Sequence, residues 1–72
     1  MVINMDNIDV RAYIINNFKE NTKEEIKASI EESISSHDDD TLIGLGVMFE
    51  LAWNNSTDKE KQEILDNIKK GM

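Results

Sequence analysis

The sequence predicts an all-α protein, a compact bundle of about four short helices around a central apolar helix at about residues 41–54. The 72-residue chain has no proline and three glycines, so little in it interrupts a helix. Apolar residues recur at helical spacing along the chain, and no segment alternates as a strand does. We expect residues 1–72 to form a single small domain, with flexibility expected only in residues 1–6.

The first helix is expected to start after Asp6 or Asn7, either of which is a good N-cap, and to end near Phe18. Apolar residues then follow the i, i+4, i+7 spacing of one helix face. These residues are Ile8, Ala12 and Ile15.

A second helix is predicted from Thr22 to about Ser35. Thr22 is followed three residues later by Glu25, which is the capping-box pattern at the start of a helix. One narrow apolar stripe runs along this helix. It consists of Ile26, Ile30 and Ile34.

The third helix is expected at about Thr41 to Asn54, after a loop at residues 36–40. Glu50 is the only charge between residues 42 and 53, so this helix is apolar nearly all round, which is typical of a buried helix. Phe49 and Trp53 lie at i and i+4 and are expected in the core, although exposure of that aromatic surface would indicate a binding face.

The fourth helix follows a turn at residues 54–56. Thr57 and Glu60 form a second capping-box pattern, and Gly71 stands where a C-terminal cap is expected. The helix carries apolar residues on one side and two basic residues in its last turn, which suits the helix dipole. These residues are Ile64, Leu65, Ile68, Lys69 and Lys70.

Composition argues against several classes of function. The formal net charge is −7 and Arg11 is the only arginine, so the chain lacks the clustered cations with which proteins bind nucleic acids or anionic membranes. The apolar run at residues 42–53 is well short of the roughly 20 residues of a membrane span. With no cysteine, disulfides and thiolate metal sites are excluded.

Neither a catalytic nor a cofactor site is predicted. The acidic run from His37 to Asp40 has three adjacent aspartates, which point in different directions, so we interpret it as a solvated loop that caps the third helix rather than as a metal site. Glu50 has neither a second acid nor a histidine near it in the sequence, and it is expected at the solvent-facing edge of its helix. We therefore predict no enzyme activity, metal, cofactor or small-molecule substrate.

The third helix is instead the predicted interaction surface. Gly44 and Gly46 each cost a helix roughly 1 kcal/mol relative to alanine, which suggests that another backbone comes close to them. That backbone belongs either to the same chain, which we slightly favour, or to a partner. The candidate interaction residues are Leu42, Gly44, Leu45, Gly46, Phe49 and Trp53. The expected partner is a second copy, in a two-fold dimer, or another protein.

The block Gly44-Leu45-Gly46-Val47-Met48-Phe49-Glu50, followed by Trp53, resembles the small acid-soluble spore protein I family of spore-forming Firmicutes. Asn55-Ser56 and Lys61-Gln62-Glu63-Ile64-Leu65-Asp66 extend the resemblance, which covers about Ile8 to Gly71. One departure is Ile43, where the family has proline.

This resemblance implies a cellular location and a time of synthesis rather than a molecular mechanism. It implies synthesis in the developing forespore, a location in the forespore cytoplasm or spore core, and no enzymatic activity. It also implies a protein distinct from the DNA-coating small acid-soluble spore proteins. The leading hypothesis is a minor spore-core protein with a structural, protective or partner-binding role. The alternative is an acidic adaptor or regulator that binds one specific protein through the apolar face of the third helix.

Overall fold

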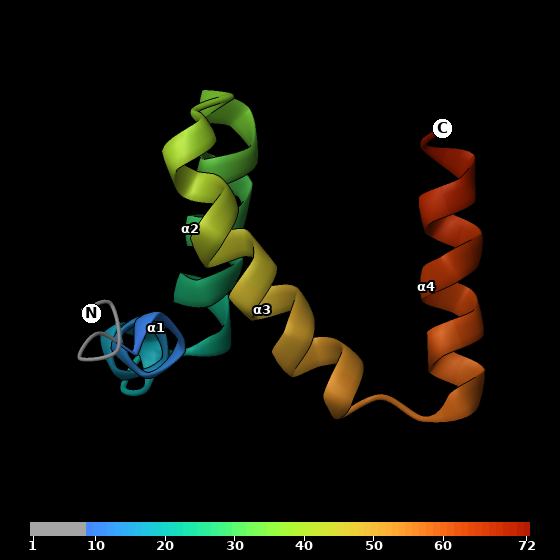
Figure 1. Ribbon diagram of the computed structural model, residues 1–72, viewed down its shortest axis with the longest axis horizontal. Coiled ribbons are helices and arrows are strands. Elements are labelled where there is room, and N and C mark those ends of the chain that lie inside the picture. The colour runs from blue at the N-terminus through green and yellow to red at the C-terminus, as the bar shows by residue number, and fades with distance from the viewer. Residues whose placement is uncertain (1–8) are drawn as a thin grey trace, which may run out of the picture.

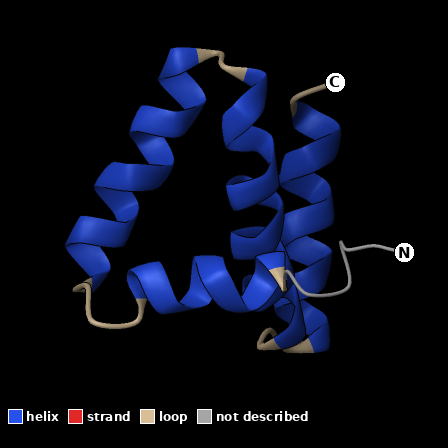
Figure 2. Ribbon diagram, turned by 60° about the vertical axis from the view of Figure 1, so that its left-hand side comes forward, coloured by secondary structure: helices blue, strands red, loops and turns tan. Residues whose placement is uncertain are grey.

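The computed structural model describes residues 9–72, which form four α-helices and one 3-10 turn (Figure 1). The elements are α1 (Val10–Phe18), α2 (Lys23–Ser36), η2 (Asp39–Thr41), α3 (Leu42–Asn54) and α4 (Asp58–Lys70). The part of the chain that the structure describes contains only helices and loops, as Figure 2 shows, so the all-α prediction is confirmed. The expected caps Asp6 and Asn7 and the expected flexibility of residues 1–6 lie outside the described residues.

Side-chain caps set the starts of three helices. The helix α1 starts later than predicted, because its N-cap is Asp9, whose Oδ1 accepts a hydrogen bond from the backbone N–H of Ala12 at 3.1 Å. Both predicted capping boxes are confirmed. In the first, Glu25 N–H donates to Thr22 Oγ1 at 3.2 Å and Thr22 N–H donates to Glu25 Oε1 at 2.9 Å. Thr57 and Glu60 repeat this exchange at 3.1 and 2.7 Å.

The segment between α2 and α3 is more regular than the predicted loop. His37 adopts a left-handed conformation with φ of 53°, and its N–H donates to the carbonyl of Ile34. Asp38 Oδ1 then accepts from the N–H of Asp40 at 2.9 Å and caps η2. Thr41 Oγ1 donates to the carbonyl of Asp38 at 2.7 Å. These bonds turn the chain sharply, so α3 runs back along α2 (Figure 1).

The helix α3 is central, since α1 and α2 both pack on it. Val47 is 6% exposed and is the only buried residue of the described chain. The prediction that Phe49 belongs to the core is wrong, because 44% of its surface is exposed. At the start of the helix, Leu42 and Ile43 are 60% and 61% exposed. The expected burial of α3 is therefore only partial, because two short helices cover only part of its circumference.

The helix α4 stands away from α1 and α2 and forms a V with α3 (Figure 1). A hydrogen-bonded turn joins the two arms. Asn55 Nδ2 donates to the carbonyl of Leu51 at 2.8 Å, and Ser56 Oγ donates to that of Ala52 at 2.6 Å. The start of α3 and the end of α4 therefore lie at the same, open end of the V, as Figures 1 and 2 both show. Gly71 is the C-cap of α4 as predicted, with a right-handed φ of −79°.

Candidate interaction surface

Four of the six candidate interaction residues share one face of α3. They recur at i, i+4, i+7 and i+11, the spacing of a single helix face. We call Leu42, Gly46, Phe49 and Trp53 the open face of α3. Leu42, Gly46 and Phe49 are exposed, and Trp53 is half-buried. The face is open to solvent, although α1 flanks its first half, where Val10 and Arg11 share an open hollow with Leu42 and Gly46.

The other two candidates turn toward α2. Gly44 and Leu45 line a small cavity of about 40 Å³ between α2 and α3. Side chains from α1, α2 and α3 complete its wall. These are Phe18, Ser29, Ile30, Ser33 and Met48. Gly44 therefore lies on the packed side of α3, whereas Gly46 lies on the open side.

The two glycines are not needed for packing among the described residues. A Cβ atom built on Gly44 or Gly46 would meet nothing within 4 Å. Our slight preference for close intrachain packing at these glycines is therefore wrong for the described part of the chain. Because glycine destabilises a helix by roughly 1 kcal/mol relative to alanine, their presence has no explanation in the packing seen here.

Glu50, the one charge of α3, is held by α1. Arg11 Nε donates to Glu50 Oε1 at 2.7 Å, and Arg11 Nη2 donates to Glu50 Oε2 at 2.9 Å. This two-bond geometry is the strong form of an arginine–carboxylate pair. The hydrogen bond from Arg11 lowers the pKa of Glu50. The same hydrogen bond to Glu50 raises the pKa of Arg11. Glu50 was predicted at the solvent-facing edge of its helix, and its side chain is half-exposed there, but its partner Arg11 was not predicted.

The base of the V carries an aromatic cluster. The rings of Phe49 and Trp53 lie 5.7 Å apart between centroids and are tilted by 31°. Lys61 Nζ from α4 lies 5.3 Å from the centroid of the Trp53 ring, within the range of a cation–π contact. Beside this cluster, a shallow groove lies between α3 and α4. It is lined by Phe49, Glu50, Trp53, Asn54, Leu65 and Ile68.

The helix α4 contributes to this surface in a way that was not predicted from the sequence. Leu65 and Ile68 were predicted only as apolar residues of the fourth helix, and they are 41% and 40% exposed. With Ile64 they form one apolar side of α4, which we call the apolar face of α4. Their spacing was visible in the sequence, but periodicity shows which residues share a face and not whether a neighbour covers it.

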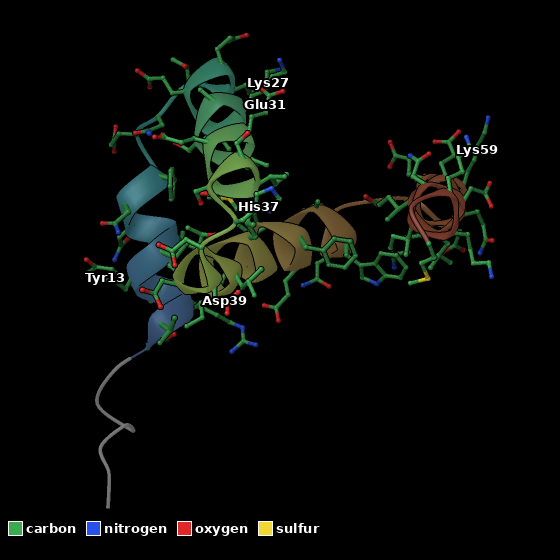
Figure 3. All side chains as sticks on the ribbon, turned by 90° about the horizontal axis from the view of Figure 1, so that it is seen from above. Tyr13, Lys27, Glu31, His37, Asp39 and Lys59 are labelled. Carbon is green, nitrogen blue, oxygen red and sulfur yellow. The ribbon has the colours of Figure 1, made fainter. Side chains whose placement is uncertain are left out.

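The described residues contain no group of three or more histidine, cysteine or acidic side chains that could hold a metal ion. His37 and Asp39 lie at the corner between α2 and α3, remote from α4 (Figure 3). Asp38 serves there as a cap, as described above. Glu50 is occupied by Arg11, and the described chain places no nucleophile or second acid beside it. Among the described helices, none combines the length and the apolar character that crossing a membrane requires.

Comparison with known proteins supplies the family. The family model described as "Small, acid-soluble spore protein I" matches residues 8–72. A small, acid-soluble spore protein I of Bacillus cereus (strain AH187) is 33% identical over 64 residues, which are 89% of this chain and 93% of the relative. The protein of that name from Bacillus anthracis (strain A0248) matches to the same extent. No solved structure matches the chain. The chain belongs to the small acid-soluble spore protein I family.

Proposed function

We propose that this spore protein is a non-enzymatic component of the spore core that acts by binding protein through the open face of α3. The observation that carries the proposal is the exposure of apolar side chains on α3 and α4, which lie together at the groove of the V. Contiguous apolar surface on a small polar protein marks an interaction site. A catalytic role would need an acid–base or nucleophile constellation, and the described residues offer none to support it.

The surroundings of the open face suit a reversible protein contact. Charged residues border it, namely Arg11 of α1 with Glu50 of α3 on one side and Lys61 of α4 on the other. An apolar centre with a polar rim is the usual anatomy of a protein interface. Phe49 and Trp53 would supply the aromatic anchors that carry much of the binding energy in such interfaces.

The acidic adaptor is the second candidate function, and the charge of α2 favours it. Three exposed glutamates of this helix have no basic partner within salt-bridge distance among the described residues. They are Glu24, Glu25 and Glu32. A basic partner would be attracted to this side of the molecule, and its association rate would fall as salt is added.

Photo-crosslinking in spores tests the proposal. A photoreactive phenylalanine derivative replaces Phe49 in one strain and the exposed Ala28 of α2 in a matched control strain. We expect core extracts, prepared after the coat has been removed, to contain the protein and to show a discrete crosslinked product from position 49 only. A protein found in the coat fraction, or equal crosslinking from both positions, would contradict the proposal. A single heterologous product would favour the adaptor.

A further inference from the structure

We propose that a second copy of this chain covers the open face of α3 together with the apolar face of α4. Each V-shaped α3–α4 pair would interlock with that of its partner about a two-fold axis and form a four-helix bundle. This inference rests on the proposed function, because it names the partner that binds the same surface.

Exposed apolar side chains on both helices of the V supply the material of an interface. Leu42 and Phe49 on α3 and Leu65 and Ile68 on α4 are each at least 40% exposed. Apolar and aromatic side chains of this kind form the buried centre of a protein interface, where charged residues are depleted.

Gly46 indicates where the second backbone approaches. It lies within the open face of α3, between Leu42 and Phe49, and a Cβ atom there would meet nothing within 4 Å outside its own helix. A helix position without a side chain allows a neighbouring helix to pack closely against the backbone. The position therefore fits a crossing point between α3 and a helix of the second copy.

Charge favours α4 of the second copy as the helix that crosses α3. Residues 9–57 hold ten acidic and four basic side chains, so two copies that met through this region alone would repel each other. In contrast, α4 holds four of each. A two-fold contact between α3 and α4 therefore places a neutral helix, rather than a second acidic surface, on the open face.

The start of α3 and the end of α4 are also complementary in charge. The acidic turn Asp38–Asp40 precedes α3 at the open end of the V, and Lys69 and Lys70 end α4 at the same end (Figures 1 and 2). When α4 of the second copy lies antiparallel to α3, its two lysines come beside these three aspartates. The helix dipoles of an antiparallel pair also oppose each other favourably.

Closure of α4 onto α3 within one chain is the rival arrangement. The hydrogen bonds of Asn55 and Ser56 both end on α3 carbonyls and fix only the exit of the chain from α3, whereas the Lys61–Trp53 contact joins α3 to α4 at the base of the V. A closed chain would be a monomer and a chain covered by a second copy would be a dimer, so the oligomeric state separates the two arrangements.

Sedimentation of the purified chain tests the inference. We expect a dimer from low to high micromolar concentration for the wild type. Gly46→Leu should be monomeric with unchanged helical circular dichroism, because a Cβ atom there meets nothing within 4 Å and the position lines an open hollow in a single chain. The matched control Ala28→Leu adds the same side chain to α2, two residues beyond Ile26 and so on the opposite side of that helix, and it should remain dimeric.

A charge variant supplies a second measurement. Reversal of both terminal lysines, Lys69→Glu with Lys70→Glu, should weaken the dimer about tenfold at low salt and by less at high salt. A wild type that stays monomeric at high micromolar concentration would overturn the inference, as would a Gly46→Leu variant that dimerises like the wild type. If the chain is monomeric while position 49 crosslinks a different protein in spores, only this inference fails; if position 49 also crosslinks nothing, the proposed function fails with it.

Discussion

The pair of Arg11 and Glu50 explains why a carboxylate stands in an otherwise apolar helix. Two charge-assisted hydrogen bonds of 2.7 and 2.9 Å tie α1 to α3 across 39 positions of sequence. Apolar packing between these helices fixes their distance but is less directional than a two-bond contact. We therefore assign Glu50 to the orientation of α1, and not to chemistry.

Stability should fall with acid through this pair. The pKa of Glu50 is lowered in the folded chain, so its contribution is present above the carboxylate's ordinary pKa and is lost as pH falls through the folded value. Denaturant unfolding across acidic and neutral pH should show wild type more stable than Glu50→Gln near neutrality. The two curves should converge in acid. A difference that is constant with pH would contradict this assignment, and Arg11→Gln is the matched control from the other partner.

Core substitutions should rank by burial and not by size. Val47→Ala should cost about 2 kcal/mol of unfolding free energy, because it removes methyl groups from the most buried side chain. Phe49→Ala should cost no more than that, about 1–2 kcal/mol in dilute protein, although it deletes a whole ring, because Phe49 is 44% exposed. Denaturant melts of both variants give the comparison. A loss of 3–5 kcal/mol at Phe49 would show that the ring is buried.

Loss of the capping box of α4 should destabilise that helix locally, and more than loss of the other capping box should destabilise α2. With 13 residues and few contacts to the other helices, α4 depends on its own propensity and cap more than α2 does. Thr57→Ala should lower the local stability of α4 by about 1 kcal/mol and speed amide exchange there about fivefold, with α1–α3 unaffected. Thr57→Ser retains a hydroxyl cap and serves as the control. If the substitution accelerated amide exchange equally along the whole chain, α4 would unfold together with the other helices.

The features predicted correctly from the sequence are those that depend on residues close together in the chain. Capping boxes depend on residues three positions apart, so Thr22 with Glu25 and Thr57 with Glu60 were visible without a structure. The alignment of Leu42, Gly46, Phe49 and Trp53 on one face also follows from helical spacing alone.

What the sequence did not predict depends on tertiary placement. The partner of Glu50 lies 39 residues away, and no pattern links the two positions. The exposure of Phe49, Leu65 and Ile68 was missed because an apolar stripe is the same in the sequence whether its own chain or a partner covers it. His37 in the left-handed region was also missed, since glycine and asparagine are the usual residues there.

The chain as a whole combines an acidic exterior with an incomplete core. One described residue is buried, whereas a fully packed domain would enclose the apolar residues of α3 on all sides. The negative charge keeps such a molecule soluble while its apolar surface remains available. Both properties suit a protein whose exposed apolar surface is covered by another protein molecule. They argue against binding to nucleic acids, because the negative charge of the chain repels phosphates.

Duplex DNA should therefore not bind. The net charge is −7, and the eight basic residues are spread over α1, α2, α4 and the segments between them among fifteen acids. Binding to DNA requires several cations that neutralise phosphates together and release counterions, and no described surface groups them in that way. A labelled duplex titrated with the purified chain at low salt should keep its anisotropy up to high micromolar protein. A basic DNA-binding protein in the same buffer is the positive control. Tight binding that weakens steeply as salt rises would contradict the prediction, because that slope is the signature of phosphate contacts.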